Sequence, residues 1–377
     1  MVLLCLQDEK NSGWSDMAQE MLTASKGIDG KIKVLIVDDS PMMCKALEQI
    51  LGEDDQIQVQ SRALNGQEAL NKLSAGGFDV CTLDVHMPGM NGLTVLKNIM
   101  VRYPIPTLMV SAFTGDGSRV TFEALRFGAV DFFKKPTRNG DEELKSQAEL
   151  LCSRLKRASR VQVEAARYLR IRPVRRSMQT ENKERSGENV KALAVIHGST
   201  GGYSSILSIV PHLSGAMDIP VVVSLGTSKE NLNAFVDYLR PFAAVPLVVP
   251  EKQVRLMPGS VYFLASDQTG TFEKDGAEWD MLVRQRPIKA DNEGAIDLIL
   301  LSASEAFGRD CLAVFVSGDN SHGMTGAKEV LRGGGTLLVQ NPSSCLAPFL
   351  PLHIMDKFNA ESSGSAEIAG RLSKWKV

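Results

Sequence analysis

The sequence predicts two consecutive α/β domains, each built on a parallel sheet with helices on both faces. A chain of 377 residues is too long for one compact core, because a domain usually spans roughly 100 to 200 residues. Apolar runs at 33–37, 78–83 and 107–112 alternate with stretches of helical spacing such as 42–51, and this alternation is typical of a doubly wound parallel sheet. Hydrophobic residues make up 44% of the chain and charged residues 23%, which excludes wholesale disorder and a membrane bundle.

The same patterns divide the chain into four segments. Residues 7–30 are polar and weakly periodic, so we expect a poorly ordered tail over 1–30, within which Met17 offers an alternative start. The first domain is predicted at 31–152, with a last helical pattern from about 141 to 155. Residues 153–190 read as a linker, and 191–377 as the second domain. The strands expected in that second domain lie at 192–196, 221–225, 261–265, 311–317 and 336–340.

The linker is strongly basic. Residues 153–185 contain eleven Lys or Arg and three Glu, a net charge of +8. A solvated connector, partly helical at first, is the simplest interpretation, and an electrostatic contact with the domains is the alternative. A third possibility is DNA binding through this segment, but no helix-turn-helix pattern supports it. The whole chain carries a net charge of −2, which gives no general attraction to nucleic acid or anionic lipid.

The sequence also points to the cytoplasm. Met1–Leu6 form only a short apolar run without a basic region before it, and nowhere do about 18 apolar residues follow one another. We therefore expect neither a signal peptide nor membrane insertion. The six cysteines are scattered without a CxxC pair, which favours buried, reduced thiols over a zinc site or a disulfide framework.

Acidic side chains follow two of the expected strands of the first domain. Asp38 and Asp39 close the first strand and Asp84 closes the run at 78–83. Ligands gather beyond the carboxyl ends of the strands in such sheets, and three carboxylates there suit Mg²⁺. Ser111 and Lys135 stand at the ends of later strands, where a hydroxyl and an ammonium can meet an added phosphoryl group. These groups together are the parts needed for phosphoryl transfer to a carboxylate.

Four motifs carry a resemblance to a known domain. They are Val-Asp-Asp-Ser-Pro at 37–41, Asp-Val-His-Met-Pro-Gly-Met-Asn-Gly-Leu at 84–93, Val-Ser-Ala at 110–112 and Phe-Lys-Lys-Pro at 133–136. In this order they resemble a response-regulator receiver domain, which has a flavodoxin-like fold.

The resemblance implies a role for each residue of the predicted site. Asp84 would be the phosphate acceptor, and Asp38 and Asp39 would hold Mg²⁺ together with it. Lys135 would pair with the phosphate. The switch residues would be Ser111 and the aromatic Phe132. His86 stands where the closest relatives usually have an acidic residue, a change that bears on the rate and lifetime of phosphorylation.

A serine begins the second domain in an exposed turn. Ala-Val-Ile-His-Gly-Ser-Thr-Gly-Gly at 194–202 reads as a strand, a turn of small residues and a helix from about Tyr203. Ser199 would lie near the helix N-terminus, where it can serve as a nucleophile or bind an anion. The segment is not a GxSxG motif, because His197 replaces the first glycine. An ordinary capped turn also fits it.

The wider context favours a chemical role for this serine. Met-Pro-Gly-Ser-Val-Tyr at 257–262, Gly-Ala-Ile-Asp-Leu-Ile-Leu at 294–300, Ser-Gly-Asp-Asn-Ser-His-Gly-Met-Thr-Gly at 317–326 and Gly-Gly-Thr-Leu-Leu-Val-Gln-Asn at 334–341 follow in order. Behind a receiver and a linker, they resemble the chemotaxis protein-glutamate methylesterase/glutaminase (CheB) family, whose output domain is Rossmann-like. The resemblance implies a Ser-His-Asp triad that hydrolyses glutamyl methyl esters on chemoreceptors and deamidates selected glutamines. It also implies a sensor histidine kinase as phosphodonor.

Two of the three triad positions depart from the family pattern. Ser199 matches the nucleophile, but Leu225 stands at the position of the histidine and His322 at that of the aspartate. Asp319 replaces a methionine near the oxyanion hole, where a carboxylate would oppose developing negative charge unless it points away. We expect impaired or absent esterase activity and an output by binding receptor or kinase complexes, or a phosphate sink. The alternative is an active enzyme in which His322 or His197 serves Ser199 as a displaced base.

Overall fold

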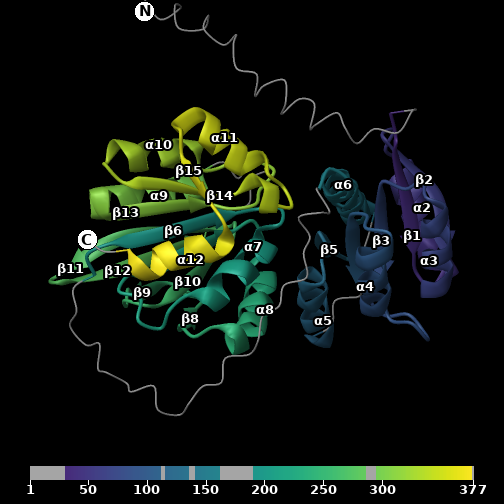
Figure 1. Cartoon of the computed structure of the whole chain (residues 1–377), viewed down its shortest axis with the longest axis horizontal. Helices are drawn as coiled ribbons and strands as arrows, with labels where there is room; N and C mark the ends of the chain where they lie inside the picture. The colour runs from purple at the N-terminus through teal and green to yellow at the C-terminus, as the bar shows by residue number, and fades with distance from the viewer. Residues whose placement is uncertain (1–29, 112–114, 136–140, 162–189, 286–293, 376–377) are drawn as a thin grey trace, which may run out of the picture.

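The computed structural model describes residues 30–111, 115–135, 141–161, 190–285 and 294–375 (Figure 1). The expected tail and most of the expected basic linker lie outside these residues. Two parallel sheets organise the described part of the chain, as the sequence predicts, and a smaller antiparallel sheet accompanies the second.

The first domain contains a five-stranded parallel sheet with the order β2-β1-β3-β4-β5, the arrangement of a flavodoxin-like fold. Its strands are β1 (Ile32–Val37), β2 (Ile57–Ala63), β3 (Val80–Asp84), β4 (Thr107–Ser111) and β5 (Asp131–Lys134). Its helices are α2 (Pro41–Gly52), α3 (Gly66–Ala75), α4 (Gly92–Arg102), α5 (Gly115–Arg126) and α6 (Asp141–Ala158). Figure 1 shows α5 and α6 at the side of this domain nearest to the second domain, with α2 and α3 at the opposite side.

Alternation along the strands divides the core of this domain between the two faces of the sheet. Leu35 and Leu83 join the apolar cluster with α3, α4 and α5, whereas Val34 and Ile36 join the cluster with α2 and α6. Polar caps fix where several helices begin. The Ser40 hydroxyl, for example, accepts a hydrogen bond from the N–H of Met43 at the start of α2.

The second domain is built on a seven-stranded sheet with the order β15-β14-β13-β6-β7-β10-β8, in which all pairs are parallel. Its strands are β6 (Leu193–Gly198), β7 (Val221–Leu225), β8 (Leu247–Val248), β10 (Val261–Leu264), β13 (Cys311–Phe315), β14 (Thr336–Gln340) and β15 (Glu361–Ser363). Its α-helices are α7 (Gly202–Ile209), α8 (Lys229–Leu239), α9 (Ala295–Phe307), α10 (Met324–Arg332), α11 (Phe349–Phe358) and α12 (Ser365–Lys374). Short 3₁₀ turns lie at η2 (Val210–His212), η3 (Arg240–Phe242), η4 (Gly308–Asp310) and η5 (Pro342–Ser344).

The second domain also contains a three-stranded antiparallel sheet that the sequence analysis does not anticipate. It consists of β9 (Gln253–Arg255), β11 (Gln268–Asp275) and β12 (Glu278–Gln285). Strands β11 and β12 form a hairpin around Gly276, which has a φ of +62°, and a two-residue hairpin turn favours glycine in that conformation. Asp275-Gly276 between two alternating runs was therefore a readable turn signal.

The last helix of the first domain extends into the segment expected to be linker. Helix α6 continues past residue 153 to Ala158, and Leu155 and Ala158 are buried in the cluster shared with α2. Lys156 on the same turn forms an ion pair with Asp54, 2.6 Å between Nζ and Oδ2. The beginning of the basic segment is thus part of the first domain's packing.

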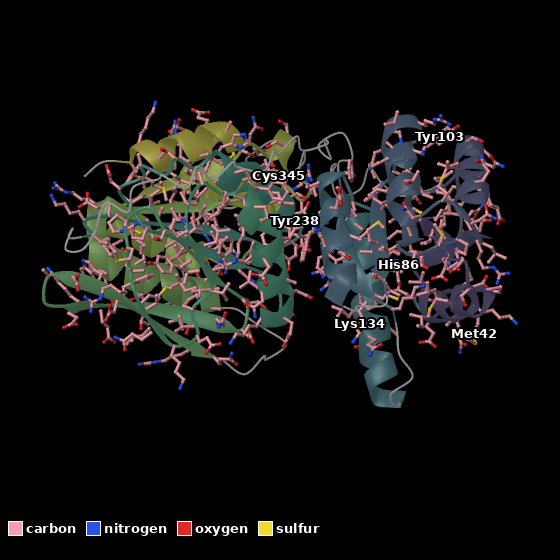
Figure 2. All side chains as sticks on the ribbon, turned by 90° about the horizontal axis from the view of Figure 1, so that it is seen from below. Met42, His86, Tyr103, Lys134, Tyr238 and Cys345 are labelled. Atoms are coloured by element: carbon pink, nitrogen blue, oxygen red, sulfur yellow. The ribbon has the colours of Figure 1, made fainter. Side chains whose placement is uncertain are left out.

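Aromatic side chains join the two domains. Phe122 of α5 is fully buried, and its ring centroid lies 5.6 Å from that of Tyr203, 5.3 Å from that of Phe235 and 5.7 Å from that of Tyr238. The Arg126 side chain adds a hydrogen bond of 3.4 Å from Nη1 to the Tyr238 hydroxyl. Figure 2 shows Tyr238 on the side of the second domain that faces the first. One apolar cluster therefore runs without interruption through both domains.

Candidate functional site

The three predicted acids of the first domain converge at the carboxyl end of its sheet. Asp38 and Asp39 follow β1, and Asp84 ends β3, which pairs with β1. One carboxylate oxygen from each lies within 4.8 Å of the others. Asp38 and Asp84 are buried and Asp39 is exposed, so the group opens to solvent on one side. Three hard oxygen ligands in this arrangement are typical of a Mg²⁺ site.

Lys135 lies between two of these acids. Its Nζ is 2.7 Å from Oδ2 of Asp38 and 2.8 Å from Oδ2 of Asp84. Burial raises the pKa of Asp38 above its usual value, and the hydrogen bond from Lys135 only partly opposes this. Burial would lower the pKa of Lys135, but its hydrogen bonds to the two carboxylates raise it above its usual value. The ammonium group therefore stays charged and partly offsets the repulsion between the acids.

Ser111 and His86 complete the surroundings of Asp84. The Ser111 hydroxyl is buried at the end of β4, and its oxygen has no hydrogen-bond partner among the described residues. The His86 side chain is exposed, while its backbone N–H donates to Oδ1 of Asp84 at 3.2 Å. The predicted site residues of this domain therefore do come together, apart from Phe132.

Phe132 lies at the boundary between the domains instead. It is buried on β5, and its ring centroid is 5.7 Å from that of Phe122 and 5.7 Å from that of Tyr203 in α7. The Tyr203 hydroxyl in turn hydrogen-bonds to Oγ1 of Thr227 at 2.5 Å. The sequence analysis places Tyr203 at the start of a helix but does not foresee this contact, which crosses from one domain to the other.

Ser199 lies in a tight turn between β6 and α7. Its backbone N–H donates to the carbonyl of Ser317 at 3.0 Å, which ties the turn to the end of the neighbouring strand β13. Gly201 has a φ of +78°, and a Cβ there would lie 2.4 Å from Oγ of Ser317. Only glycine fits that position, so the small-residue motif has a steric cause.

The Ser199 hydroxyl contacts Asp319. Its Oγ donates to Oδ1 of Asp319 at 3.1 Å, and the backbone N–H of Asp319 donates to the same Oγ at 3.2 Å. The other carboxylate oxygen of Asp319, Oδ2, lies 3.1 Å from Nε of Arg157 in α6. The carboxylate therefore points toward the serine. Arg157 belongs to the basic segment that the sequence analysis assigns to the linker, and nothing in the sequence indicates this ion pair.

Both candidate histidines lie near the serine without bonding to it. His197 on β6 is only 6% exposed, and burial lowers its pKa to about 3, with the charge of His322 adding to the effect. Its ring packs edge-on against Phe315, at a centroid distance of 6.4 Å. Among the residues that the structure describes, neither imidazole forms a hydrogen bond with Oγ of Ser199. Leu225, which the sequence analysis places at the position of the histidine, is buried at the end of β7.

These groups surround one cavity between the domains. Its volume is about 390 Å³, and both domains line it. The first domain contributes Asp131, Phe132, Arg154 and Arg157, and the second contributes His197, Ser199, Leu225, Thr227, Asp319 and His322, among others. A ligand that reaches Ser199 in this arrangement must pass side chains of both domains.

Two family models match the chain. One, described as a response regulator receiver domain, matches residues 34–148, and the other, described as CheB methylesterase, matches residues 194–372. Together with the two sheets and their sites, they define a response regulator that joins a receiver to a methylesterase-type domain. Among the helices that the structure describes, none is long and apolar enough to cross a bilayer.

Curated relatives narrow the assignment. The chain is 30% identical over 329 residues to protein-glutamate methylesterase/protein-glutamine glutaminase 1 of Carboxydothermus hydrogenoformans, covering 86% of this chain and 93% of that protein. It is 30% identical over 351 residues to the corresponding protein 1 of Oleidesulfovibrio alaskensis, covering 88% and 95%. A relative from Pyrococcus abyssi with the same name, without a number, is 28% identical over 321 residues. The chain belongs to the CheB family of protein-glutamate methylesterases/protein-glutamine glutaminases.

Proposed function

We propose that this chain is a phosphorylation-controlled chemotaxis response regulator of the methylesterase type whose esterase step is impaired or absent. Its output is then binding to receptor or kinase complexes, in the cytoplasm and without nucleic acid binding or membrane insertion. The observation that carries the proposal is the hydrogen bonding of Ser199. Its hydroxyl donates to Asp319, and no imidazole accepts it among the described residues.

The loss of the base has a large kinetic consequence. In a Ser-His-Asp triad an imidazole within hydrogen-bond reach takes the proton of the serine, and Leu225 cannot play that part. Removal of the base or nucleophile from such a triad typically costs roughly 10⁴ to 10⁶ in turnover. Hydrolysis that remains would be slow against that of relatives with a complete triad.

The receiver has the parts for phosphorylation. We propose that Asp84 accepts the phosphoryl group from a sensor histidine kinase and that Asp38, Asp39 and Asp84 hold Mg²⁺. Bound Mg²⁺ supplies positive charge that offsets the phosphoryl oxygens. Lys135, now between Asp38 and Asp84, would pair with the added phosphate, and the Ser111 hydroxyl would turn toward it.

Aromatic contacts offer a route by which phosphorylation of the receiver could alter the second domain. Phe132 packs against Tyr203, and Tyr203 hydrogen-bonds to Thr227 at the wall of the cavity. We propose that a rotation of Phe132 on phosphorylation weakens this contact and shifts the population toward separated domains. The surface thereby exposed is the one that would meet chemoreceptors or the kinase complex.

The second candidate function is an active receptor methylesterase/glutaminase with a displaced histidine. It is favoured by the position of His197 and His322, which line the same cavity as Ser199. Either ring would have to turn or move to accept the proton of Ser199.

Methanol release from methylated chemoreceptor membranes tests the proposal. The full-length protein is treated with beryllofluoride to mimic phosphorylation and is compared with Ser199→Ala and with Ser208→Ala, a control serine later in α7. The proposal expects release close to the Ser199→Ala background, together with phosphorylation-dependent sedimentation with the membranes. Rapid release that disappears only in Ser199→Ala would establish the active enzyme. Equal sedimentation with and without beryllofluoride would refute the binding output.

A further inference from the structure

Asp319 is the side chain that contacts the Ser199 hydroxyl in the described part of the chain. We propose that Asp319 is the proton acceptor of Ser199, so that the chemistry left in this domain uses a serine–carboxylate pair instead of a histidine. This inference rests on the proposed function in one respect, because it takes Ser199 to be the nucleophile of a methylesterase-type domain.

The backbone holds the two residues together. Ser199 follows β6 and Asp319 follows β13, and these two strands pair in parallel, with Phe315 opposite His197. Gly318 lets the serine come close, because a Cβ at that position would lie 2.8 Å from Oγ of Ser199. The close approach of Oγ and Oδ1 therefore follows from strand pairing and a required glycine rather than from one surface rotamer.

The two histidines are poorer acceptors in this geometry. His197 is confined between strands and packs against Phe315. The loop of His322 is held locally, where its backbone N–H donates to Oδ1 of Asn320 at 3.2 Å. Neither ring forms a hydrogen bond with Oγ of Ser199 in the described residues. Asp319 forms two, because its carboxylate accepts one from Oγ and its backbone N–H donates one to Oγ.

The reaction balances with water as the only co-reactant. Oγ of Ser199 forms a bond to the carbonyl carbon of a glutamyl methyl ester while its proton passes to Oδ1 of Asp319. The tetrahedral intermediate then collapses, the C–OCH₃ bond breaks, and the leaving oxygen takes the proton from Asp319 as methanol. Water attacks the acyl-enzyme in the same way, gives its proton to Asp319, and Ser199 leaves with that proton.

The charge of Asp319 changes during this sequence. A carboxylate beside a developing oxyanion is unfavourable as long as it stays ionised. Proton transfer from Ser199 neutralises Asp319 at the step that creates the oxyanion, so the negative charge moves without a second one being added. The same residue that weakens an oxyanion hole as a carboxylate is thus compatible with it as an acid.

Arg157 then controls the base from the other domain. Its Nε lies 3.1 Å from Oδ2 of Asp319, so the guanidinium competes with Ser199 for this carboxylate while the domains are docked. We therefore expect Arg157→Ala to raise the reactivity of Ser199 in the protein without beryllofluoride.

The test reads the reactivity of Ser199 directly. A fluorophosphonate probe labels serine nucleophiles, and its labelling rate is measured by mass spectrometry on the full-length protein with beryllofluoride. The variants are Asp319→Asn, Asp319→Glu and Ser199→Ala. Asp310→Asn, on the same domain and outside the cavity lining, makes the same charge change as a control. Thermal unfolding and phosphorylation by acetyl phosphate check that each variant is folded.

We expect Asp319→Asn to slow the labelling of Ser199 roughly 100-fold, the size of a general-base contribution, with partial recovery in Asp319→Glu. Labelling of Asp319→Asn as fast as that of the parent would overturn the proposal. Labelling no faster than that of Ser199→Ala would also overturn it. A loss of labelling in His322→Ala or His197→Asn, without a loss in Asp319→Asn, would overturn it as well.

Methanol release separates this hypothesis from the impaired esterase. Rapid release that depends on Asp319 would refute the impaired esterase and leave the role of Asp319 standing.

Discussion

Replacing Phe122 by alanine is expected to separate the two domains while leaving each of them folded. The Phe122 ring is fully buried and makes three aromatic contacts across the boundary, with Tyr203, Phe235 and Tyr238. Aromatic pairs contribute about 0.5 to 1.5 kcal/mol each beyond area burial, so the three contacts together contribute about 1.5 to 4.5 kcal/mol. Since about 1.4 kcal/mol corresponds to a factor of ten, the docking equilibrium should shift by about ten-fold or more.

Hydrogen exchange and small-angle X-ray scattering measure this shift. In Phe122→Ala the amides of α8 should lose protection, and the radius of gyration should increase. The matched control is Phe133→Ala, a ring on β5 that packs in the cluster of α2 and α6. That variant should destabilise the first domain and leave the protection of α8 near that of the parent. Equal protection of α8 in the two variants would show that the aromatic contacts do not hold the domains together.

Three further predictions concern the separate sites. Mg²⁺ should raise the unfolding temperature of the parent and not that of Asp84→Asn, because one of the three carboxylates is lost; equal shifts in calorimetry would contradict the site. His197 has a pKa of about 3 in the folded protein, below its usual value near 6.5, so the unfolded chain binds the extra proton between these values. The stability is unaffected by this group above about pH 6.5 and falls by about 1.4 kcal/mol for each pH unit from there down to about pH 3. Urea unfolding of His197→Asn should show a correspondingly smaller loss. Gly201→Ala should destabilise the protein by about 2 kcal/mol or more through strain and overpacking, against less in Gly276→Ala, which has a positive φ but open space around it; equal urea midpoints would refute the steric argument.

The sequence predicts those parts of the fold that local hydrophobic patterns determine, namely the buried strands and the helices between them. Strands such as β1 and β3 are largely apolar and buried, and the acids at their ends meet because the carboxyl ends of parallel strands share one edge. Strand β2 was overlooked because it is an edge strand in which polar residues alternate with apolar ones, and its burial alternates accordingly. The antiparallel sheet has a local turn signal at Gly276, but the alternation of strands and helices along the chain predicts the parallel sheet alone.

A single sequence does not predict the direction of a side chain. Asp319 turns toward Ser199 because β6 pairs with β13 and Gly318 leaves space, and both features join residues far apart in the sequence. The ion pair of Arg157 with Asp319 depends in addition on how the domains dock. A basic residue in an expected linker gives no local signal of either.

Two contacts of different kinds join the receiver to the wall of the cavity. The apolar one runs from Phe132 to Tyr203, at the start of the helix that follows Ser199. The ionic contact runs from Arg157 to Asp319, whose carboxylate accepts a hydrogen bond from the hydroxyl of Ser199. Arg157 is 39% exposed, so its ion pair contributes little to docking, about 0 to 1 kcal/mol, whereas the buried aromatic rings contribute more. We therefore expect the aromatic contacts to decide whether the domains stay together. Separation of the domains would remove Arg157 from Asp319 and leave that carboxylate to the Ser199 hydroxyl.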